Sequence, residues 1–292
     1  MRWWPGIVLG FALALPRPAA AQMAESIASV SADHAPTTRG PLPGQRVGTS
    51  VLRANMGYPL VLKGGWVLLP SVSYERLAFR SDGLAIAPRT LHAPMASLGV
   101  LRVFTPRLMG LLSVSGGFAS DFERPVAADE LVVTGMVLAM YRFSDDLTIG
   151  AGVGYDRRTG NVQPLPALPV KWRPSSRFQL RGVVPAFLSA EYRTAPWLTA
   201  ALRGSFEGNR YHLGASRYGT DDLQLAYSVI GVGPRLTFHL GKLLHLDVYG
   251  NVPVLRRYAT YVDDDKTSSS YLKPVFTFGT RLWVGPDPWA RK

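Results

Sequence analysis

The feature that most constrains the fold is an alternation of apolar residues with polar or small residues, which repeats from residue 48 to residue 284. Successive side chains of a β-strand point to opposite faces, so a period of two predicts strands with one apolar face. In the run 178–192, for example, Phe178, Leu180 and Leu188 share one face and Gln179 the other. No convincing amphipathic helix interrupts these runs. We therefore expect an all-β chain.

One run, "LTIGAGVGYD" at residues 147–156, resembles a phosphate-binding loop at first sight. A dinucleotide fingerprint requires G-x-G-x-x-G between a strand and a helix. Here Gly150, Gly152 and Gly154 are spaced G-x-G-x-G, and no helical pattern follows. We interpret the segment as a strand with its glycines on the non-apolar face. Either bulky side chains from across the molecule or water would fill the space beside them.

The N-terminus carries an export signal. Arg2 precedes an apolar stretch and three consecutive alanines, the order of a cleavable signal peptide, so we assign residues 1–21 to it with cleavage after Ala21. The apolar stretch is shorter than the roughly 20 residues that a membrane-spanning helix needs. Residues 22–47 are rich in Ala, Ser, Thr, Pro and Gly, and we interpret them as a flexible periplasmic lead.

An exported chain with repeated alternation is either a soluble β-protein or a membrane β-barrel. The runs are long enough to cross a bilayer, since a tilted strand needs roughly 9–11 residues. Their non-apolar face is rich in Gly, Ser and Thr, which suits a crowded lumen, and closure satisfies every strand backbone in lipid. Aromatic residues near the ends of the runs would form a girdle at the lipid headgroups. This predicted girdle comprises Trp66, Tyr141, Phe143, Tyr155, Trp172, Tyr192, Trp197 and Trp283.

Short and long connections alternate along the chain. Tight breaks such as "KGGW", "SDDL" and "TAPW" lead into apolar runs, while longer polar segments occupy 80–92, 120–129, 208–221 and 259–270. Short periplasmic turns and longer external loops are typical of outer-membrane barrels.

The signal peptide, the alternating strands, the turn in "SDDLTIGAGVGY" and the closing "PVFTFGTRLW" together resemble the outer-membrane β-barrel proteins of Gram-negative bacteria, including their porin-like, functionally uncharacterised families. The resemblance covers residues 48–284. It implies a closed antiparallel transmembrane barrel in the cell outer membrane, placed there by the outer-membrane insertion machinery. The class usually ends on an aromatic residue, whereas here a tail at 285–292 follows. The tail is an extension, or the insertion signal lies at Phe278–Trp283.

The number of strands depends on one proline. If 178–192 is a single strand the chain has about twelve strands, which is the count we expect. If Pro185 marks a tight hairpin, an even barrel requires a further strand from the lead and the count becomes fourteen. Further prolines fall within the runs and are expected at bulges or strand ends: Pro59, Pro70, Pro94, Pro169, Pro234, Pro253 and Pro274.

Charged residues on the non-apolar faces are expected to line the lumen. The predicted set is Arg53, Glu75, Asp156, Lys171, Arg173, Arg181, Glu191, Arg203, Glu207, Asp247, Lys273 and Arg281. Two interpretations stay open: ion pairs that fill a structural barrel, or a passive channel whose mixed-charge, net cationic lumen favours small anionic solutes. The chain carries a formal charge of +12, so outer-membrane lipid and lipopolysaccharide are the expected surface partners, and nucleic acid is not.

Two alternative functions remain at the level of sequence. A barrel-embedded lipid hydrolase needs a nucleophile beside a base, and His212 with Ser216 is the nearest local pair, but it matches no lipase motif. A soluble exported β-barrel that binds an apolar ligand is the other. The remaining histidines are scattered without metal-ligand spacing, and the sequence indicates no enzyme, metal or cofactor.

Overall fold

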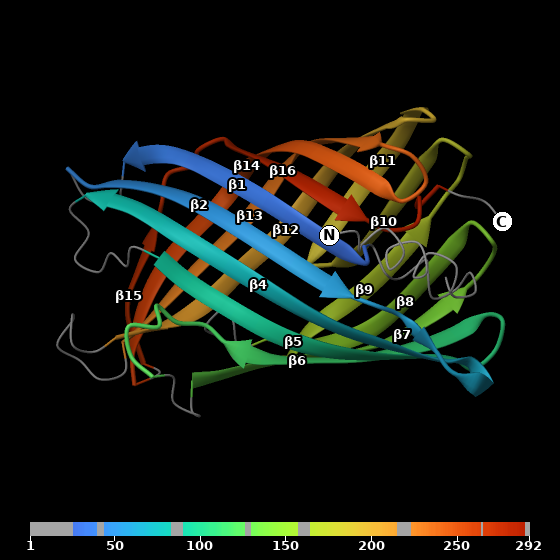
Figure 1. The fold of residues 1–292 in the computed structure, drawn as a ribbon, viewed down its shortest axis with the longest axis horizontal. Coiled ribbons are helices and arrows are strands. Elements are labelled where there is room, and N and C mark those ends of the chain that lie inside the picture. The colour runs from blue at the N-terminus through green and yellow to red at the C-terminus, as the bar shows by residue number, and fades with distance from the viewer. Residues whose placement is uncertain are drawn as a thin grey trace, which may run out of the picture.

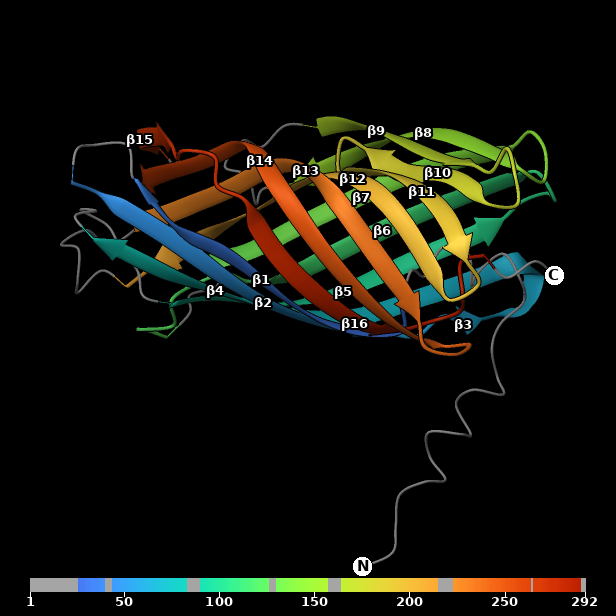
Figure 2. The ribbon, with the colours of Figure 1, turned by 90° about the horizontal axis from the view of Figure 1, so that it is seen from above.

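The computed structural model shows a closed barrel of tilted antiparallel strands (Figures 1 and 2). It describes residues 26–39, 44–82, 90–125, 130–156, 164–214, 223–263 and 265–289. The predicted signal peptide lies outside these ranges. The described part of the chain contains no helix long and hydrophobic enough to span a lipid bilayer.

The strands follow one another along the chain with short or long connections. The first are β1 (Ala28–Arg39), β2 (Arg46–Gly57), β3 (Leu60–Val61), a 3-10 turn η1 (Lys63–Gly65), β4 (Trp66–Asp82), β5 (Thr90–Val103), β6 (Leu108–Phe118), β7 (Leu131–Arg142) and β8 (Leu147–Asp156). The others are β9 (Pro164–Trp172), β10 (Phe178–Val184), β11 (Phe187–Ala195), β12 (Leu198–Leu213), β13 (Leu223–His239), β14 (Leu244–Val262), β15 (Asp265–Tyr271) and β16 (Thr277–Val284).

Each strand pairs with its sequence neighbour, and β1 pairs with β16 to close the barrel. The short β3 only extends the edge of β4. β15 and β16 pair with successive lengths of β14, so together they form one interrupted strand. The barrel therefore has 14 strands. This confirms the predicted closed antiparallel architecture and corrects the expected count of twelve to the alternative.

One missing strand was hidden by a tight hairpin. Residues 185–186 connect β10 to β11, and the register pairs Val183 with Phe187. A two-residue connection preserves the alternation, so even-numbered residues point outward on both strands. For this reason the sequence of 178–192 has the pattern of one continuous strand.

The other missing strand is β1, which lies in the segment predicted to be a flexible lead. Ala28 to Arg39 pair with β2 over most of their length, and Ala28 to His34 also pair with β16. The prediction of a lead is therefore wrong for this stretch. Its small residues alternate only weakly in hydrophobicity, and the tertiary pairing with both neighbours decides its structure.

The apolar faces of the strands point outward. Val137 on β7 is 58% exposed, whereas its neighbour Leu138 is 3% exposed and faces the interior. Exposed apolar side chains occur on every barrel strand from β4 to β16, for example Val72, Leu112 and Leu202. A soluble barrel would turn these side chains inward, so the arrangement favours a lipid environment.

The two ends of the barrel differ. One end has only short connections, which are 58–65, 104–107, 143–146, 173–177, 196–197 and 240–243, whereas the hairpin at 185–186 points towards the other end, where the longer connections lie. Both described chain ends also lie there, since β1 begins and β16 finishes at this end (Figures 1 and 2). We call it the short-turn end, and we call the opposite one the long-loop end. The short-turn end corresponds to the periplasmic side in the usual barrel topology.

The glycine-rich strand β8 packs closely against its neighbour. A Cβ atom on Gly152 would lie 2.0 Å from the carbonyl oxygen of Val137 and 2.6 Å from the side chain of Leu138. Gly154 has no heavy atom closer than 3.9 Å. The space at Gly152 is therefore occupied by the adjacent strand β7, not by water or by side chains from across the barrel.

Candidate solute site inside the barrel

A chamber of about 420 Å³ lies inside the barrel near the short-turn end. Methionine and leucine side chains from β6 and β7, among them Met109, Met140 and Leu138, form one wall. Basic residues from the opposite strands form another. The chamber is therefore amphipathic, with an apolar side and a cationic side.

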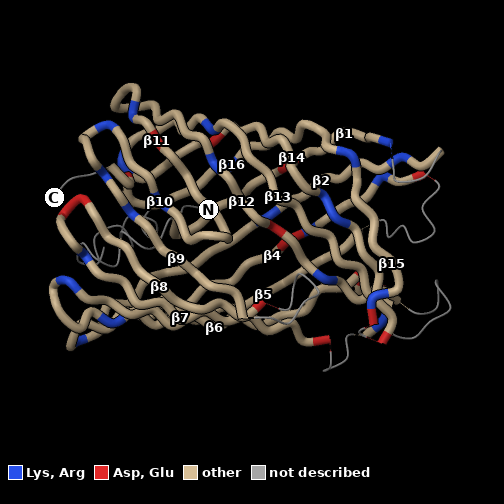
Figure 3. Tube along the Cα trace, turned by 180° about the vertical axis from the view of Figure 1, so that it is seen from behind, with Lys and Arg blue, Asp and Glu red and all other residues tan. Residues whose placement is uncertain are grey.

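The chamber has an excess of positive charge. Six basic residues line it against three acidic ones, so the formal net charge of its lining is +3. The basic residues are Arg142, Lys171, Arg173, Arg181, Arg235 and Arg281, and the acidic ones are Glu191, Asp247 and Asp287. In Figure 3 basic residues lie at this end of the barrel and also at the opposite end.

Glu191 is held by three donors at the cationic wall. Arg181 donates from Nε to Oε1 at 2.8 Å, Gln179 donates to Oε2 at 2.6 Å, and the Ser189 hydroxyl lies 3.0 Å from Oε1. Strands β10 and β11 bring these side chains together because Arg181 and Ser189 are register partners. The charge of Glu191 is thus compensated locally by Arg181, and other basic groups of the chamber face the cavity.

Asp247 is the second compensated carboxylate. Thr237 donates to it at 2.8 Å, the indole N–H of Trp283 donates at 3.1 Å, and Arg235 lies 3.6 Å away. Trp283 is therefore buried inside the barrel at 7% exposure, with its ring 3.9 Å from that of His245. The prediction that Trp283 belongs to an outward girdle is wrong, because the odd-numbered residues of β16 face the interior of the barrel.

Two histidines meet beside this carboxylate. His239 at the end of β13 and His245 on β14 are register partners, and their Nδ1 atoms lie 2.8 Å apart. Thr199 contacts Nε2 of His239 at 2.9 Å. The sequence interpretation of scattered histidines is wrong for this pair, since the 240–243 turn folds them together. In the ranges that the structure describes, no group of three or more His, Asp or Glu side chains is arranged to hold a metal ion.

The tail closes part of the short-turn end. Trp289 is buried, and the guanidinium of Arg173 lies 5.1 Å from its ring centroid. Arg173 also donates to the carbonyl oxygen of Pro288 at 2.8 Å, and Arg193 pairs with Asp287 at 3.1 Å. Residues 286–289 line the chamber. The described part of the tail therefore packs into the barrel end.

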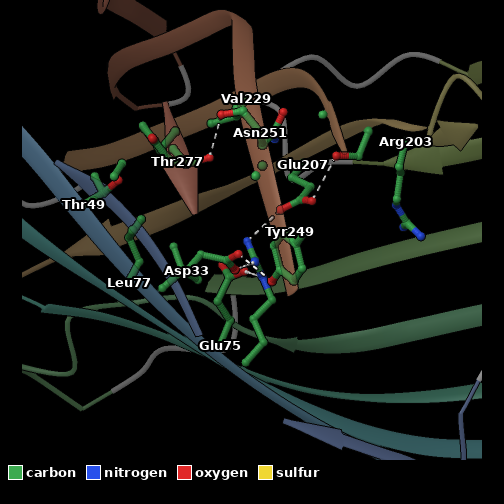
Figure 4. Close-up of a pocket in the computed structure, with 18 of the residues that line it drawn as sticks. Asp33, Thr49, Glu75, Leu77, Arg203, Glu207, Val229, Tyr249, Asn251 and Thr277 are labelled. Atoms are coloured by element: carbon green, nitrogen blue, oxygen red, sulfur yellow. Dashed lines mark hydrogen bonds and ion pairs between the residues drawn. The ribbon is translucent and has the colours of Figure 1, made fainter. Parts of the chain in front are cut away.

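A second polar cluster crosses the middle of the barrel, where it borders a cavity of about 130 Å³ (Figure 4). Arg53 on β2 contacts Asp33 and Glu75 at 2.6 Å each and Glu207 on the far wall at 2.9 Å. Tyrosines donate to two of these carboxylates at 2.6 Å: Tyr249 to Asp33 and Tyr211 to Glu75. One guanidinium thus links three carboxylates across the lumen.

The interior towards the long-loop end contains an apolar cluster, with the buried polar side chains of Arg256, Gln224 and Glu130 in the same half of the barrel. The cluster comprises the buried side chains of Val47, Leu77, Phe79, Leu91, Ala93, Ala119, Val132, Tyr211, Leu213, Leu223, Leu225, Tyr227, Tyr258 and Leu272. These residues come from β2, β4, β5, β7, β12, β13 and β14 and from positions 119 and 272 next to strands, and β8 to β11 contribute none. We call this set the apolar cluster, and in this conformation it separates the polar clusters from the long loops.

The structure distributes the predicted lumen charges among these features. Those at the chamber are Lys171, Arg173, Arg181, Glu191, Asp247 and Arg281. Those at the middle cluster are Arg53, Glu75, Arg203 and Glu207. Asp156 lies at the long-loop end of β8, and Lys273 is exposed between β15 and β16, so neither joins these sites.

Several site residues were missed by sequence reasoning. Asp33 lies in the presumed lead, and Trp289 lies in the presumed tail. Arg235 lies on the same face of β13 as Thr237, and this signal was sufficient to find it, whereas Arg142 shares its face of β7 with Met140 and Leu138, so no polar alternation marks it. The pairings that Tyr211 and Tyr249 make are long-range and leave no mark in the local sequence.

The other predicted girdle residues are exposed on the outer surface. Those at or near the short-turn end are Trp66, Tyr141, Phe143, Trp172, Tyr192 and Trp197. Tyr155 lies on β8 towards the long-loop end. Of the proposed hydrolase pair, Ser216 lies outside the described residues.

Solved structures similar to this chain are barrels with low sequence identity. The NanC porin is 8% identical with a TM-score of 0.38, covering 87% of this chain and 98% of that chain. The KdgM porin in complex with disordered oligogalacturonate is 7% identical with a TM-score of 0.31, covering 87% and 97%. A Rhodopseudomonas blastica porin triple mutant is 9% identical with a TM-score of 0.24, covering 87% and 98%.

No curated protein matches the sequence. A family model described as "Domain of unknown function (DUF6268)" matches residues 63–284, which is more than half of the chain. The match begins just before β4 and finishes with the last strand, so it includes most of the barrel wall. The protein therefore belongs to the DUF6268 family.

Proposed function

We propose that the protein is an outer-membrane barrel that takes small anionic solutes into its lumen through a gated, porin-like passage. The cationic chamber is the observation that carries this proposal, since its lining has six basic residues against three acidic ones. A positive potential inside a low-dielectric wall concentrates anions and raises their rate of entry. The apolar wall of Met109 and Met140 would contact the non-polar part of such a solute.

The proposal includes a gate because two clusters of side chains lie between the chamber and the long-loop end. The Arg53 cluster and the apolar cluster fill the middle and the far half of the interior. Passage across the membrane therefore requires these layers to rearrange. A barrel that never conducts would be a structural barrel, which is the competing interpretation.

The surface supports the proposed location and partners. The outward apolar face suits a bilayer, and the exposed aromatic residues near the short-turn end suit a headgroup boundary. Outer-membrane lipid and lipopolysaccharide are the proposed surface partners, and the outer-membrane insertion machinery is the proposed route of assembly. We expect a faster-migrating band on SDS gels without boiling, whereas a soluble protein with no such shift would contradict this location.

Planar-bilayer conductance in a KCl gradient tests the function. The reversal potential of the wild-type protein should favour chloride, and Lys171→Gln should reduce this preference because Lys171 lines the chamber. Lys242→Gln is the matched control, since Lys242 is exposed in the 240–243 turn at the same end. A cation-selective wild type, or equal effects of the two substitutions, would contradict the role of the chamber. A barrel that is folded but silent would support the structural interpretation instead.

A further inference from the structure

The hydrogen-bonded wall of the barrel is interrupted along one line. β1 pairs with β16 only from Ala28 to His34, because β16 begins at Thr277. β15 lies against β14 alone (Figure 2). Among the described residues, no backbone hydrogen bond joins residues 35–39 to residues 265–276. We call the line between residues 35–39 and 272–276 the seam.

Prolines on both sides explain why pairing stops there. Pro36 follows the last residues of β1 that pair with β16, and Pro274 lies between β15 and β16. Proline has no backbone N–H, so neither can donate to a neighbouring strand. The register of β1 against β2 also shifts between Ala35 and Thr38. An unpaired backbone is costly in lipid, and two prolines reduce the number of donors left without a partner.

Behind the seam lies the apolar cluster, and the buried side chain of Arg256 lies beside it, with Nε 3.2 Å from the hydroxyl of Tyr227. Leu272 reaches inward from the seam and is 3% exposed within the apolar cluster, beside residues such as Leu77 and Tyr258. Its N–H donates to the carbonyl oxygen of Arg256 on β14 at 2.9 Å. Ala35 on the other side of the seam is also buried. In the described part of the chain no backbone hydrogen bond crosses the seam, so side-chain packing closes the wall here.

The exterior of the seam faces the outer-leaflet half of the proposed membrane. From Val284 to Thr277, β16 rises about 20 Å along the barrel axis at a tilt of about 40°, against an apolar band of about 25 Å. Phe276 and Phe278 are exposed on this surface. A groove of about 380 Å³ on the outer wall, lined in part by Ala32, Leu52 and Phe278, adjoins the paired base of the seam.

We infer that the seam is a lateral portal through which the acyl chain of an outer-leaflet lipid enters the apolar cluster inside the barrel. Opening it requires Leu272 to leave the apolar cluster and breaks no hydrogen bond between β1 and the opposite edge. An acyl chain would replace the contacts of Leu272 with groups of the same polarity. The charged chamber at the short-turn end is a separate feature, so this route for lipid goes beyond the proposed uptake of anions.

Photo-labelling of the wild-type protein tests the portal. The barrel is reconstituted into vesicles of phosphatidylethanolamine and phosphatidylglycerol that contain a trace of lysophosphatidylethanolamine with a diazirine on its acyl chain. After illumination, peptide mass spectrometry locates the adducts. We expect adducts on outward residues such as Phe278 and, in addition, on the inward residues Ala35 and Leu272. Leu101, an inward residue far from the seam in the register of β5, should carry none.

A matched pair of substitutions distinguishes opening of the seam from a general loss of packing in the barrel. Leu272→Ala should increase the labelling of Ala35, because it removes the side chain that closes the seam. Leu101→Ala deletes an equally buried leucine in the intact wall and should leave Ala35 unchanged. Adducts confined to outward residues in both the wild type and Leu272→Ala would overturn the inference. Equal labelling of Leu101 and Leu272 would also overturn it, because lipid would then enter elsewhere. Conductance has no bearing on either result.

Discussion

Replacing Arg53 by methionine should destabilise the barrel substantially, because it leaves three carboxylates facing one another. Arg53 contacts Asp33, Glu75 and Glu207 at 2.6 to 2.9 Å, and each of its nitrogens serves a different partner. Methionine keeps most of the apolar stem but provides no donor. The carboxylates come from β1, β4 and β12, so the repulsion would act on opposite walls of the barrel.

The magnitude follows from how far these groups are shielded. Breaking a fully buried ion pair costs about 3–5 kcal/mol, whereas an exposed pair contributes about 0–1 kcal/mol. The four side chains are 21% to 48% exposed, so each pair lies between these limits. For the loss of all three contacts we expect the free energy of unfolding to fall by about 3 kcal/mol.

Urea unfolding in lipid vesicles, followed by tryptophan fluorescence, measures this change. Arg53→Lys is the matched control, since it retains the charge without the forked geometry and should lose about 1 kcal/mol. Adding Glu75→Gln to Arg53→Met should recover part of the loss, because one of the three like charges is removed. A loss below about 1 kcal/mol for Arg53→Met would refute the reasoning. A further fall in the free energy of unfolding when Glu75→Gln is added to Arg53→Met would also refute it.

Three further results are expected from the packing of the wall, the tail and the buried tryptophan. Gly152→Ala should lower the free energy of unfolding by about 2 kcal/mol, since its Cβ would overlap the carbonyl of Val137, whereas Gly154→Ala should change it by less than about 0.5 kcal/mol. Equal effects in urea unfolding would contradict the close approach of β7. Deleting residues 286–292 should raise single-channel conductance while the heat-modifiable gel band is retained, because the tail lines the chamber mouth; an unchanged conductance would show that the tail does not obstruct it. Trp283→Phe should cost about 1 kcal/mol through the lost bond to Asp247, and an unchanged midpoint in urea would contradict that contact.

The strands could be predicted from the sequence because each has a clear two-residue period. The period does not count strands reliably, however. The hairpin at Pro185 preserves parity, so β10 and β11 have the pattern of one strand, and β1 consists of small residues whose pairing partners lie at both ends of the chain. The pairing of β1 with β16 joins residues from the two ends of the sequence, so no local pattern predicts it.

The sequence predicts which face of a strand each site residue occupies, but it does not predict which residues contact one another. Parity places Arg53, Glu75 and Glu207 on inward faces, yet only the closed barrel brings Glu207 to Arg53. Trp283 shows the opposite error. Its place near the end of a run indicated a girdle, whereas its odd position on β16 turns it towards Asp247. An aromatic residue at a strand end is therefore assigned more safely by its parity than by its position.

The central claim is that the apolar faces of the strands contact lipid, and fluorescence quenching tests it directly. The chain has no cysteine, so a single cysteine at Val137 or at the adjacent Leu138 carries one label. In vesicles whose lipids bear a nitroxide on the acyl chain, the label at Val137 should be strongly quenched and the label at Leu138 protected, since the first side chain points outward and the second into the chamber. Strong quenching at Leu138 with protection at Val137 would contradict the account.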